Sequence, residues 1–467
     1  MNQKRLHVLL MSLTMLFTFG RFSRANEGSL TPELLRDIQK SVTVDARLHA
    51  VQNAVTANDL RGLIVNREMS NRHDDHFGFK IETPHITDQK STGRCWLFAA
   101  LNTIRPSAVK KFNVKDIEFS QNYLFLWDKL EKANMFLEAM METAGRPIDD
   151  RNIQELLESP VADGGWWNFA VALIEKYGIV PREIMPETIS SEKSKGMDDM
   201  IDNLLRKDAV ELRRLAADGK KVDRLRKEKN EMLLNVYRLL VIHLGTPPAE
   251  FTWRYEDKDG KLVEKSFTPL SFYQEAYDFS LGDFVTIANH PSHPIDKFYT
   301  IKYCRNFSDI PDMRFLNLSM QQMKAFTLAT VLDTIPVWFA ADTQHDMENK
   351  KGIMQPGIFD FKSLFDVDLT LPRKERFQYR GSTPGHAMTF IGVDIQNDRP
   401  EKWLIENSWG TDLGAKGYWT MYDGWFDEYV FVVIINKSYL PENVLKLLET
   451  TPMELPIWDP ISSMILQ

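Results

Sequence analysis

Cysteine is the residue that this sequence uses least, with only Cys95 and Cys304 among its 467 residues. Two cysteines cannot build the disulfide framework that stabilises many small exported domains. The stability of the fold must therefore come from its core. Apolar residues make up 43% of the chain and aromatic residues 11%, which is ample for one large core or for two lobes that face each other across a cleft.

An excess of positive charge is also missing. The chain has 57 Lys and Arg against 65 Asp and Glu, so its formal net charge is −8 and its pI is about 5.8. This balance gives no general attraction to nucleic acid or to an anionic membrane surface. We therefore expect no nucleic-acid partner.

Long apolar runs are absent except near the N-terminus. Lys4 and Arg5 precede an uncharged run of 15 residues, LHVLLMSLTMLFTFG, and small residues follow at Ser23 and Ala25. This order is typical of a secretory signal, and the run is shorter than the roughly 20 apolar residues that cross a bilayer. We expect residues 1–25 to be a signal peptide, the mature protein to be periplasmic or extracellular, and no membrane partner after cleavage. A cytoplasmic protein whose first residues form a buried helix or an anchor is the alternative.

The front half of the chain has the periodicity of helices. Apolar residues recur at helical steps after Cys95, with a kink or stop expected near Pro106, and further helices are expected over residues 119–140 and 168–178. Residues from about 190 to 245 carry dense charge over an apolar stripe of Leu225, Met232, Val236, Leu239 and His243. This pattern predicts a helical insertion with a solvated outer face. An oligomer contact is a second interpretation of this insertion.

The back half alternates in the manner of strands. Residues 251–269 predict a hairpin around an Asp-Gly turn, and further strands are expected over residues 387–395, 402–410 and 418–423. A helical front half and a strand-rich back half predict an α+β fold with two lobes, over a domain of residues 26–467.

Cys95 stands at the expected start of a helix, where the positive end of the backbone dipole favours a thiolate. A free cysteine is more often a buried filler of a core, so its position alone leaves both interpretations open. Gln89, six residues upstream across a glycine-containing turn, favours the nucleophile. Its amide N–H and the backbone N–H of Cys95 can converge on one point, as the oxyanion of acyl transfer requires. A glutamine in a surface loop is the alternative.

A thiolate also needs a proton partner, and His386 is the candidate. If the strands that carry His386 and Asn407 form a hairpin, their spacing centres its turn between residues 396 and 397. The two side chains then lie within a few residues of facing each other, so Asn407 can orient the imidazole while Trp409 covers their hydrogen bond. A lone histidine is more often structural, but the set of four is harder to dismiss.

The motifs around these residues, Gln-x5-Cys-Trp, Gly-His-Ala and Glu-Asn-Ser-Trp-Gly, resemble the papain-like cysteine peptidases. Two departures are Thr92 and Arg94 before the nucleophile and a spacing of 291 residues from Cys95 to His386, against about 130–150 in short enzymes. The charged insertion and the segments next to it account for the long spacing. Longer stretches, among them FSQNYLFLWDKLEKAN, DGGWWNFAVALIEKYGIVP and LPIWDP, resemble the bleomycin hydrolase and bacterial aminopeptidase C family from about residue 70 to 460.

The resemblance implies a role for each residue of the site. The implied roles are nucleophile for Cys95, general base and acid for His386, orienting group for Asn407, oxyanion donor for Gln89, and backbone pairing with substrate for Asp163, Gly164 and Gly165. Without the resemblance, a plain turn before a helix is the better interpretation of the Asp-Gly-Gly segment.

The resemblance also implies an architecture. Members of the family form hexameric barrels, and their C-terminal arm lies in the cleft, where its carboxylate meets the amino group of a peptide substrate. That arm is here about residues 452–467, and the carboxylate belongs to Gln467. The tail ISSMILQ differs from the Met-Gly-Ala-Leu that is usual in the family. The implied activity is that of an aminopeptidase without a cofactor.

Other functions stay open on this sequence. The same fold serves cysteine endopeptidases and acyltransferases, and a barrel without activity could bind peptides. A metal centre is not expected, because the ten histidines are scattered and His290 and His293 lack the other ligands that a closed zinc site needs.

Overall fold

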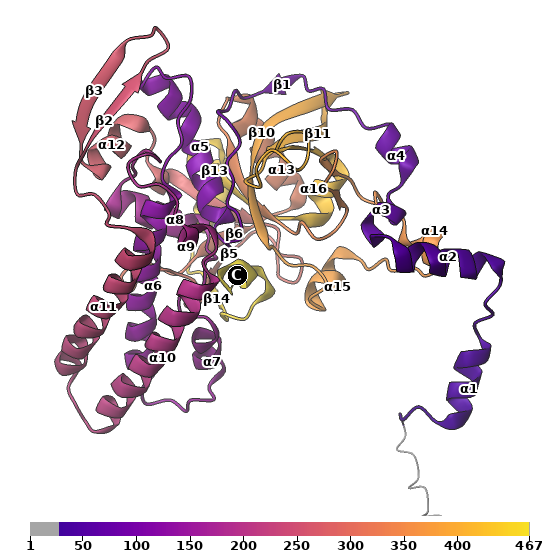
Figure 1. Cartoon of the computed structure of the whole chain (residues 1–467), viewed down its shortest axis with the longest axis horizontal. Coiled ribbons are helices and arrows are strands. Elements are labelled where there is room, and N and C mark those ends of the chain that lie inside the picture. Colours follow the sequence, from indigo (N-terminus) through magenta and orange to yellow (C-terminus); the bar gives the residue numbers. More distant parts are fainter. Residues whose placement is uncertain (1–27, 467) are drawn as a thin grey trace, which may run out of the picture. The chain divides into compact units, whose positions relative to one another are not determined.

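The computed structural model describes residues 28–466, which divide into two units, residues 28–63 and residues 64–466 (Figure 1). The signal peptide expected at residues 1–25 and the terminal Gln467 lie outside the described residues. The signal peptide therefore stays a prediction. No helix within residues 28–466 is long and apolar enough to cross a membrane.

The first unit is helical. The side chains of Thr31 and Asp45 accept backbone N–H groups and so begin α1 (Pro32–Lys40) and α2 (Ala46–Ala57). No residue of these two helices is buried. α3 (Leu60–Ile64) follows and ends at the start of the second unit. None of the residues predicted for the site belongs to this unit.

The second unit holds the predicted site. Its helices are α4 (Arg67–Asn71), α5 (Cys95–Lys111), α6 (Gln121–Glu142), α7 (Arg151–Glu158), α8 (Trp167–Tyr177), α9 (Ile189–Glu192), α10 (Lys195–Ala217), α11 (Val222–Leu244), α12 (Pro269–Ala276), α13 (Met320–Leu332), α14 (Phe361–Phe365), α15 (Arg373–Gln378), α16 (Asp423–Tyr429) and α17 (Glu442–Leu445). The 3-10 helices are η1 (Leu281–Asp283), η2 (Lys437–Tyr439), η3 (Lys446–Glu449) and η4 (Pro460–Leu466).

Most of the strands join one sheet. The strands are β1 (Phe79–Lys80), β2 (Phe251–Glu256), β3 (Leu262–Phe267), β4 (Phe284–Ala288), β5 (Lys297–Ile301), β6 (Arg314–Asn317), β7 (Val337–Ala341), β8 (Met347–Glu348), β9 (Ile353–Met354), β10 (His386–Gln396), β11 (Arg399–Glu406), β12 (Tyr418–Tyr422), β13 (Val430–Asn436) and β14 (Met453–Leu455). The sheet order is β14-β5-β6-β4-β13-β7-β10-β11-β12-β9-β8, with β1 on β10. β2 and β3 form the separate hairpin that the sequence predicts.

The core lies on both faces of the sheet. Along β7, Trp338 and Ala340 belong to a cluster with the buried residues of α5, α6 and α8, whereas Val337 and Phe339 belong to a second cluster with α13 and α16. This alternation follows from the two-residue period of a strand. The helical half and the sheet half meet along α5, where the Trp338 indole donates to the backbone carbonyl of Trp96 at 3.0 Å.

Pro106 lies inside α5 and does not end it, so the stop that was one of the two expectations is wrong. The helix continues to Lys111, and its cap forms at Phe112, whose N–H bonds the carbonyls of Ala108 and Lys110. Every residue from Cys95 to Arg105 is buried. Packing on all sides therefore outweighs the lost hydrogen bond of one proline.

The charged stretch forms two helices, α10 and α11, which run side by side along α6 (Figure 1). The buried face of α11 is centred on Val236, Leu240 and Leu244. The predicted stripe instead used Leu239 and His243, which are only half-buried, so it was wrong by one residue over the last two turns. Whether this hairpin is an insertion relative to shorter enzymes stays a prediction.

Candidate active site

Cys95 is the first residue of α5, and its thiol is buried against the sheet. Burial raises the pKa of this thiol to about 11, although the backbone N–H groups of Ala387, Trp96 and Cys95 itself hydrogen-bond the sulfur and oppose the rise. The first-turn N–H groups are available because no side chain caps the helix at Arg94. The bond from Ala387 places the sulfur beside the residue that follows His386.

His386 begins β10 and is held between two strands. Its backbone pairs with Ala341 of β7, and its ring Nε2 lies 2.8 Å from the side-chain oxygen of Asn407, just past the end of β11. The ring of Trp409 covers it at a centroid distance of 4.5 Å. Burial lowers the pKa of His386 to about 4, and the bond to Asn407 only partly opposes this.

The hairpin of β10 and β11 brings these residues together with a small shift from expectation. Gln396 pairs with Arg399, so the turn falls at Asn397 and Asp398, one residue beyond the predicted centre. Both turn residues have positive φ, 50° and 60°, as a type I′ turn requires. The turn residues set the register of the hairpin. The spacing of His386 and Asn407 could only approximate the position of that turn.

Asn407 fixes which imidazole nitrogen carries the proton. Its Oδ1 also accepts the backbone N–H of Ser408 at 2.7 Å, so this atom is an acceptor and Nε2 of His386 must donate to it. The neutral ring then keeps an unprotonated Nδ1. That nitrogen is the base available to a thiol.

Gln89 is buried and clamped at both ends of its amide. The Ser408 hydroxyl donates to Oε1 at 2.7 Å, and Nε2 donates to the backbone carbonyl of Thr92 at 2.7 Å. The Thr92 hydroxyl in turn donates to the carbonyl of Gln89 at 2.8 Å. Gln89 is therefore no surface-loop residue. One Nε2–H has no other partner within the described residues and can serve as an oxyanion donor.

The Asp163-Gly164-Gly165 segment is more than a plain turn. A Cβ added at Gly165 would lie 2.6 Å from the ring of Trp96, so only glycine fits there. The backbone carbonyl of Asp163 accepts the Trp96 indole N–H at 2.8 Å, and its carboxylate accepts the backbone N–H of Gly93 at 3.0 Å. The carboxylate is thus committed to the protein itself. Backbone pairing of this segment with a substrate stays a prediction.

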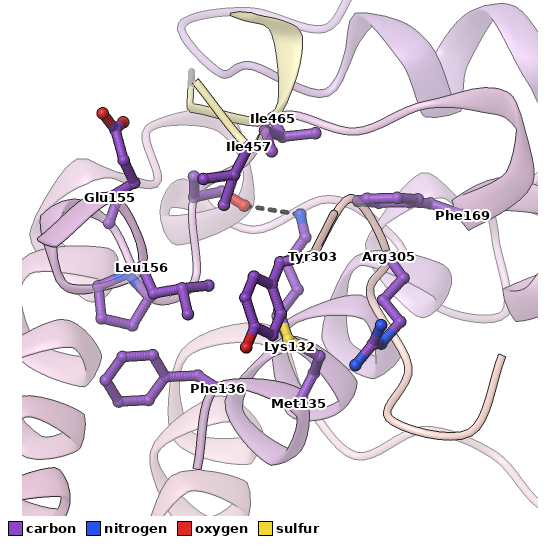
Figure 2. Close-up of a pocket in the computed structure, with 13 residues that line it drawn as sticks. Lys132, Met135, Phe136, Glu155, Leu156, Phe169, Tyr303, Arg305, Ile457 and Ile465 are labelled. Carbon is purple, nitrogen blue, oxygen red and sulfur yellow. Dashed lines mark hydrogen bonds between the residues drawn. The ribbon is translucent and has the colours of Figure 1, made fainter. Parts of the chain in front are cut away.

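The C-terminal arm reaches the segment just before the strand that carries His386. β14 pairs with β5, and the Ser463 hydroxyl then donates to the carbonyl of Pro384 at 2.6 Å. Ile457 and Ile465 of the arm also cover a small pocket of about 40 Å³ beside α6 (Figure 2). The arm is therefore seated next to the predicted site, up to the last described residues.

Several buried charges near the site were not found from the sequence. Arg94, with no exposed side chain, makes two hydrogen bonds to Glu187, at 3.1 and 2.8 Å. Lys129 bonds the Asp163 carboxylate at 2.7 Å, and Lys132 bonds the carbonyl of Gly164 at 2.7 Å. In the sequence, only Arg94 itself pointed to this buried pair, because its partner Glu187 lies 93 residues away.

His290 and His293 meet Asp459, a third group with the chemistry of a metal ligand. The Asp459 carboxylate lies 2.9 Å from Nε2 of His290 and 3.5 Å from Nε2 of His293. However, the backbone N–H of Ser292 donates to Nδ1 of His290, so Nε2 carries the proton and donates to Asp459. In this orientation His290 has no lone pair at Nε2 to offer a metal. The arrangement instead favours a hydrogen bond by which His290 holds Asp459 of the C-terminal arm.

A thiol at a helix N-terminus, beside a strand that begins with an asparagine-oriented imidazole, is the arrangement of a papain-like cysteine peptidase. The chain belongs to the Peptidase C1-like family, whose model matches residues 29–462. It is 36% identical to "Aminopeptidase C" of Streptococcus thermophilus over 93% of this chain and 99% of that protein. It is 35% identical to human "Bleomycin hydrolase" over 94% of this chain and 99% of that one. The crystal structure of PepW from Lactobacillus rhamnosis superposes with a TM-score of 0.90 at 36% identity, covering 93% of this chain and 99% of PepW.

Proposed function

We propose that this protein is a cysteine aminopeptidase, which removes N-terminal residues from peptides through a thioacyl intermediate on Cys95. One observation carries the proposal: the Ala387 N–H reaches the Cys95 sulfur while the adjacent His386 ring is bonded to Asn407. Relatives named aminopeptidase C and bleomycin hydrolase, at 35% identity or more, support the same activity.

The reaction follows from the protonation of this pair. Nδ1 of His386 accepts the thiol proton as the Cys95 sulfur attacks the carbonyl carbon, and the negative charge on oxygen is met by the backbone N–H of Cys95 and the free Nε2–H of Gln89. The C–N bond breaks as the imidazolium protonates the leaving amine. A water then attacks the thioester carbon and gives a proton to Nδ1, which returns it to the departing sulfur. Asn407 keeps the ring in place throughout.

The two pKa values set the pH range of the pair. Burial favours the neutral thiol of Cys95 and the neutral imidazole of His386, with pKa values of about 11 and about 4. The active form holds one proton between the two groups. The pair gains a second proton only as the pH falls through the pKa of His386. It loses its one proton only as the pH rises through the pKa of Cys95. The pair itself therefore stays competent over a wide range around neutrality.

The position of the arm supports exopeptidase action. The Ser463 hydroxyl of the arm bonds the carbonyl of Pro384, two residues before His386. We infer that the carboxylate of Gln467 pairs with the ammonium group of the substrate, since opposite charges in a dry cleft attract strongly. An acetylated N-terminus lacks that charge and should bind poorly.

The decisive assay compares matched free and N-acetylated peptides. The wild type should hydrolyse only the free peptide, Cys95→Ala should hydrolyse neither, and Cys304→Ala, which alters the other buried thiol, should match the wild type. Equal cleavage of both peptides would instead indicate an endopeptidase, and aminolysis products in added amine would indicate an acyltransferase. Undiminished turnover by Cys95→Ala, or tight peptide binding by an inert wild type, would contradict the proposal.

The proposal extends to assembly and location. Exposed apolar side chains on the charged hairpin support a contact between copies, namely Met200, Val210, Val222, Leu234 and Ile242. We propose a homohexamer, which light scattering would report as six copies of a chain of at most 54.2 kDa, whereas a monomer would contradict it. Export predicts that the mature protein starts at Asn26, and recovery of a cytoplasmic protein that starts at Met1 would contradict that.

A further inference from the structure

The loop that carries the nucleophile, residues 89–95, is tied to the start of the charged hairpin. The Arg94 guanidinium is wholly buried on Glu187, and the backbone N–H of Ser91 donates to the carbonyl of Glu192 at 3.1 Å. Both partners lie in residues 187–202, which we call the brace. The brace contains α9 and the first turns of α10 (Figure 1).

A second set of contacts acts through Asp163. Its carboxylate accepts the backbone N–H of Gly93 in the nucleophile loop, the Ser194 hydroxyl of the brace and the ammonium group of Lys129. Asp163 is 5% exposed and Lys129 is fully buried. One carboxylate therefore links the loop to the brace.

The brace also bonds two residues next to Asp163, namely Lys129 and Val161. Asp198 pairs with Lys129 at 2.7 Å, and the Asp202 carboxylate accepts the backbone N–H of Val161 at 3.1 Å. These contacts fix the segment that leads into Asp163 and share the positive charge of Lys129 between two carboxylates. Breaking any one of them leaves a buried charge or donor with fewer partners, which is costly in the interior.

We propose that the brace is a positioning element for catalysis, and that Asp163 and Asp198 are positioning residues that hold the Gln89–Cys95 loop in its reactive geometry. This inference rests on the proposed function, because the Gln89–Cys95 loop is reactive only if Cys95 is the nucleophile. Its physical content is the placement of the sulfur and the Gln89 amide, because a displacement of about 1 Å at a reacting centre costs about 10²-fold in rate.

The protonation of this cluster gives the proposal a distinctive readout. Burial and the neighbouring Asp163 charge raise the pKa of Asp198 to about 7. Burial would also raise the pKa of Asp163, but the positive charge of Lys129 outweighs it and holds that pKa well below its usual range. The charged groups that face the cluster are Asp128, Lys129 and Lys132 of α6, Asp163, and Asp198 with Asp202 of α10. Replacing Asp198 by asparagine removes the group that titrates near neutrality.

The test measures the rate at which iodoacetamide alkylates Cys95, followed by mass spectrometry of the Cys95 peptide, together with kcat and KM. We expect Asp163→Asn to lower both the alkylation rate and kcat about 10- to 100-fold with little change in KM. Ser194→Ala, which removes one hydroxyl, should lower them a few-fold. The matched control is Asp208→Asn, the same substitution at another buried position of α10 that lies outside the brace.

The pH dependence separates positioning from mere stability. The ratio of Asp198→Asn to wild-type alkylation rates should change between pH 6 and pH 8, because only the wild type has the Asp198 carboxyl, whose pKa is about 7. A ratio independent of pH, or equal losses in Ser194→Ala and Asp208→Asn, would overturn the inference. Alkylation needs no substrate, so these results do not depend on which reaction the enzyme catalyses. The peptidase proposal can therefore fail while the alkylation results still support the positioning role of the brace.

Discussion

Replacing Trp409 with alanine should move the acid limb of the pH–rate profile. The Trp409 ring covers His386 at 4.5 Å, and burial lowers the pKa of that imidazole from 6.5 to about 4. At about 1.4 kcal/mol per pKa unit, burial costs the charged ring about 3 kcal/mol. Without the indole, water reaches the ring and hydrates its charged form, so we expect the pKa to rise by about one to two units.

The assay is kcat/KM for a free aminoacyl amide between pH 3.5 and pH 7. Activity is lost as the pH falls through the pKa of His386, so a variant whose pKa is about 6 keeps roughly a tenth of its plateau at pH 5, where the wild type keeps about nine tenths. The substrate amine titrates near pH 8 and leaves this limb untouched. Trp127→Ala, which removes a half-buried indole from α6, is the control. An unmoved limb in Trp409→Ala would refute the assignment of His386 as the base.

Two further substitutions test the packing that supports the site. Arg94→Met leaves the Glu187 carboxylate buried without its partner, and we expect the free energy of unfolding in urea to fall by about 3–5 kcal/mol; a loss below about 1 kcal/mol would contradict the buried pair. Gly165→Ala brings a methyl group within 2.6 Å of the Trp96 ring and should cost about 1–3 kcal/mol and lower kcat, whereas Gly145→Ala, with nothing within 4 Å, should be neutral in both.

Local patterns carried most of what the sequence could predict. The start of α5 at Cys95, the β2–β3 hairpin and the closure of α8 at Gly178 each depend on residues within a few positions of one another. The meeting of His386 with Asn407 was predictable for the same reason, because one short turn separates their strands. Such features are decided by periodicity and turn chemistry.

Features that depend on distant packing were not predictable in the same way. Pro106 stays in a helix because tertiary burial outweighs its local preference. The Asp163 carboxylate accepts a hydrogen bond from Gly93, which lies 70 positions away in the sequence. Asp459 bonds His290, which lies 169 positions away. No local pattern marks such partners, since only the fold brings them together.

In the proposed reaction, the sulfur of Cys95 carries the acyl group during turnover. Acid quenching during hydrolysis of a free aminoacyl ester, followed by mass spectrometry, tests this directly. We expect an added aminoacyl mass on the peptide that contains Cys95, and none in Cys95→Ala. Rapid turnover with that cysteine unmodified, or an adduct on another residue, would contradict it.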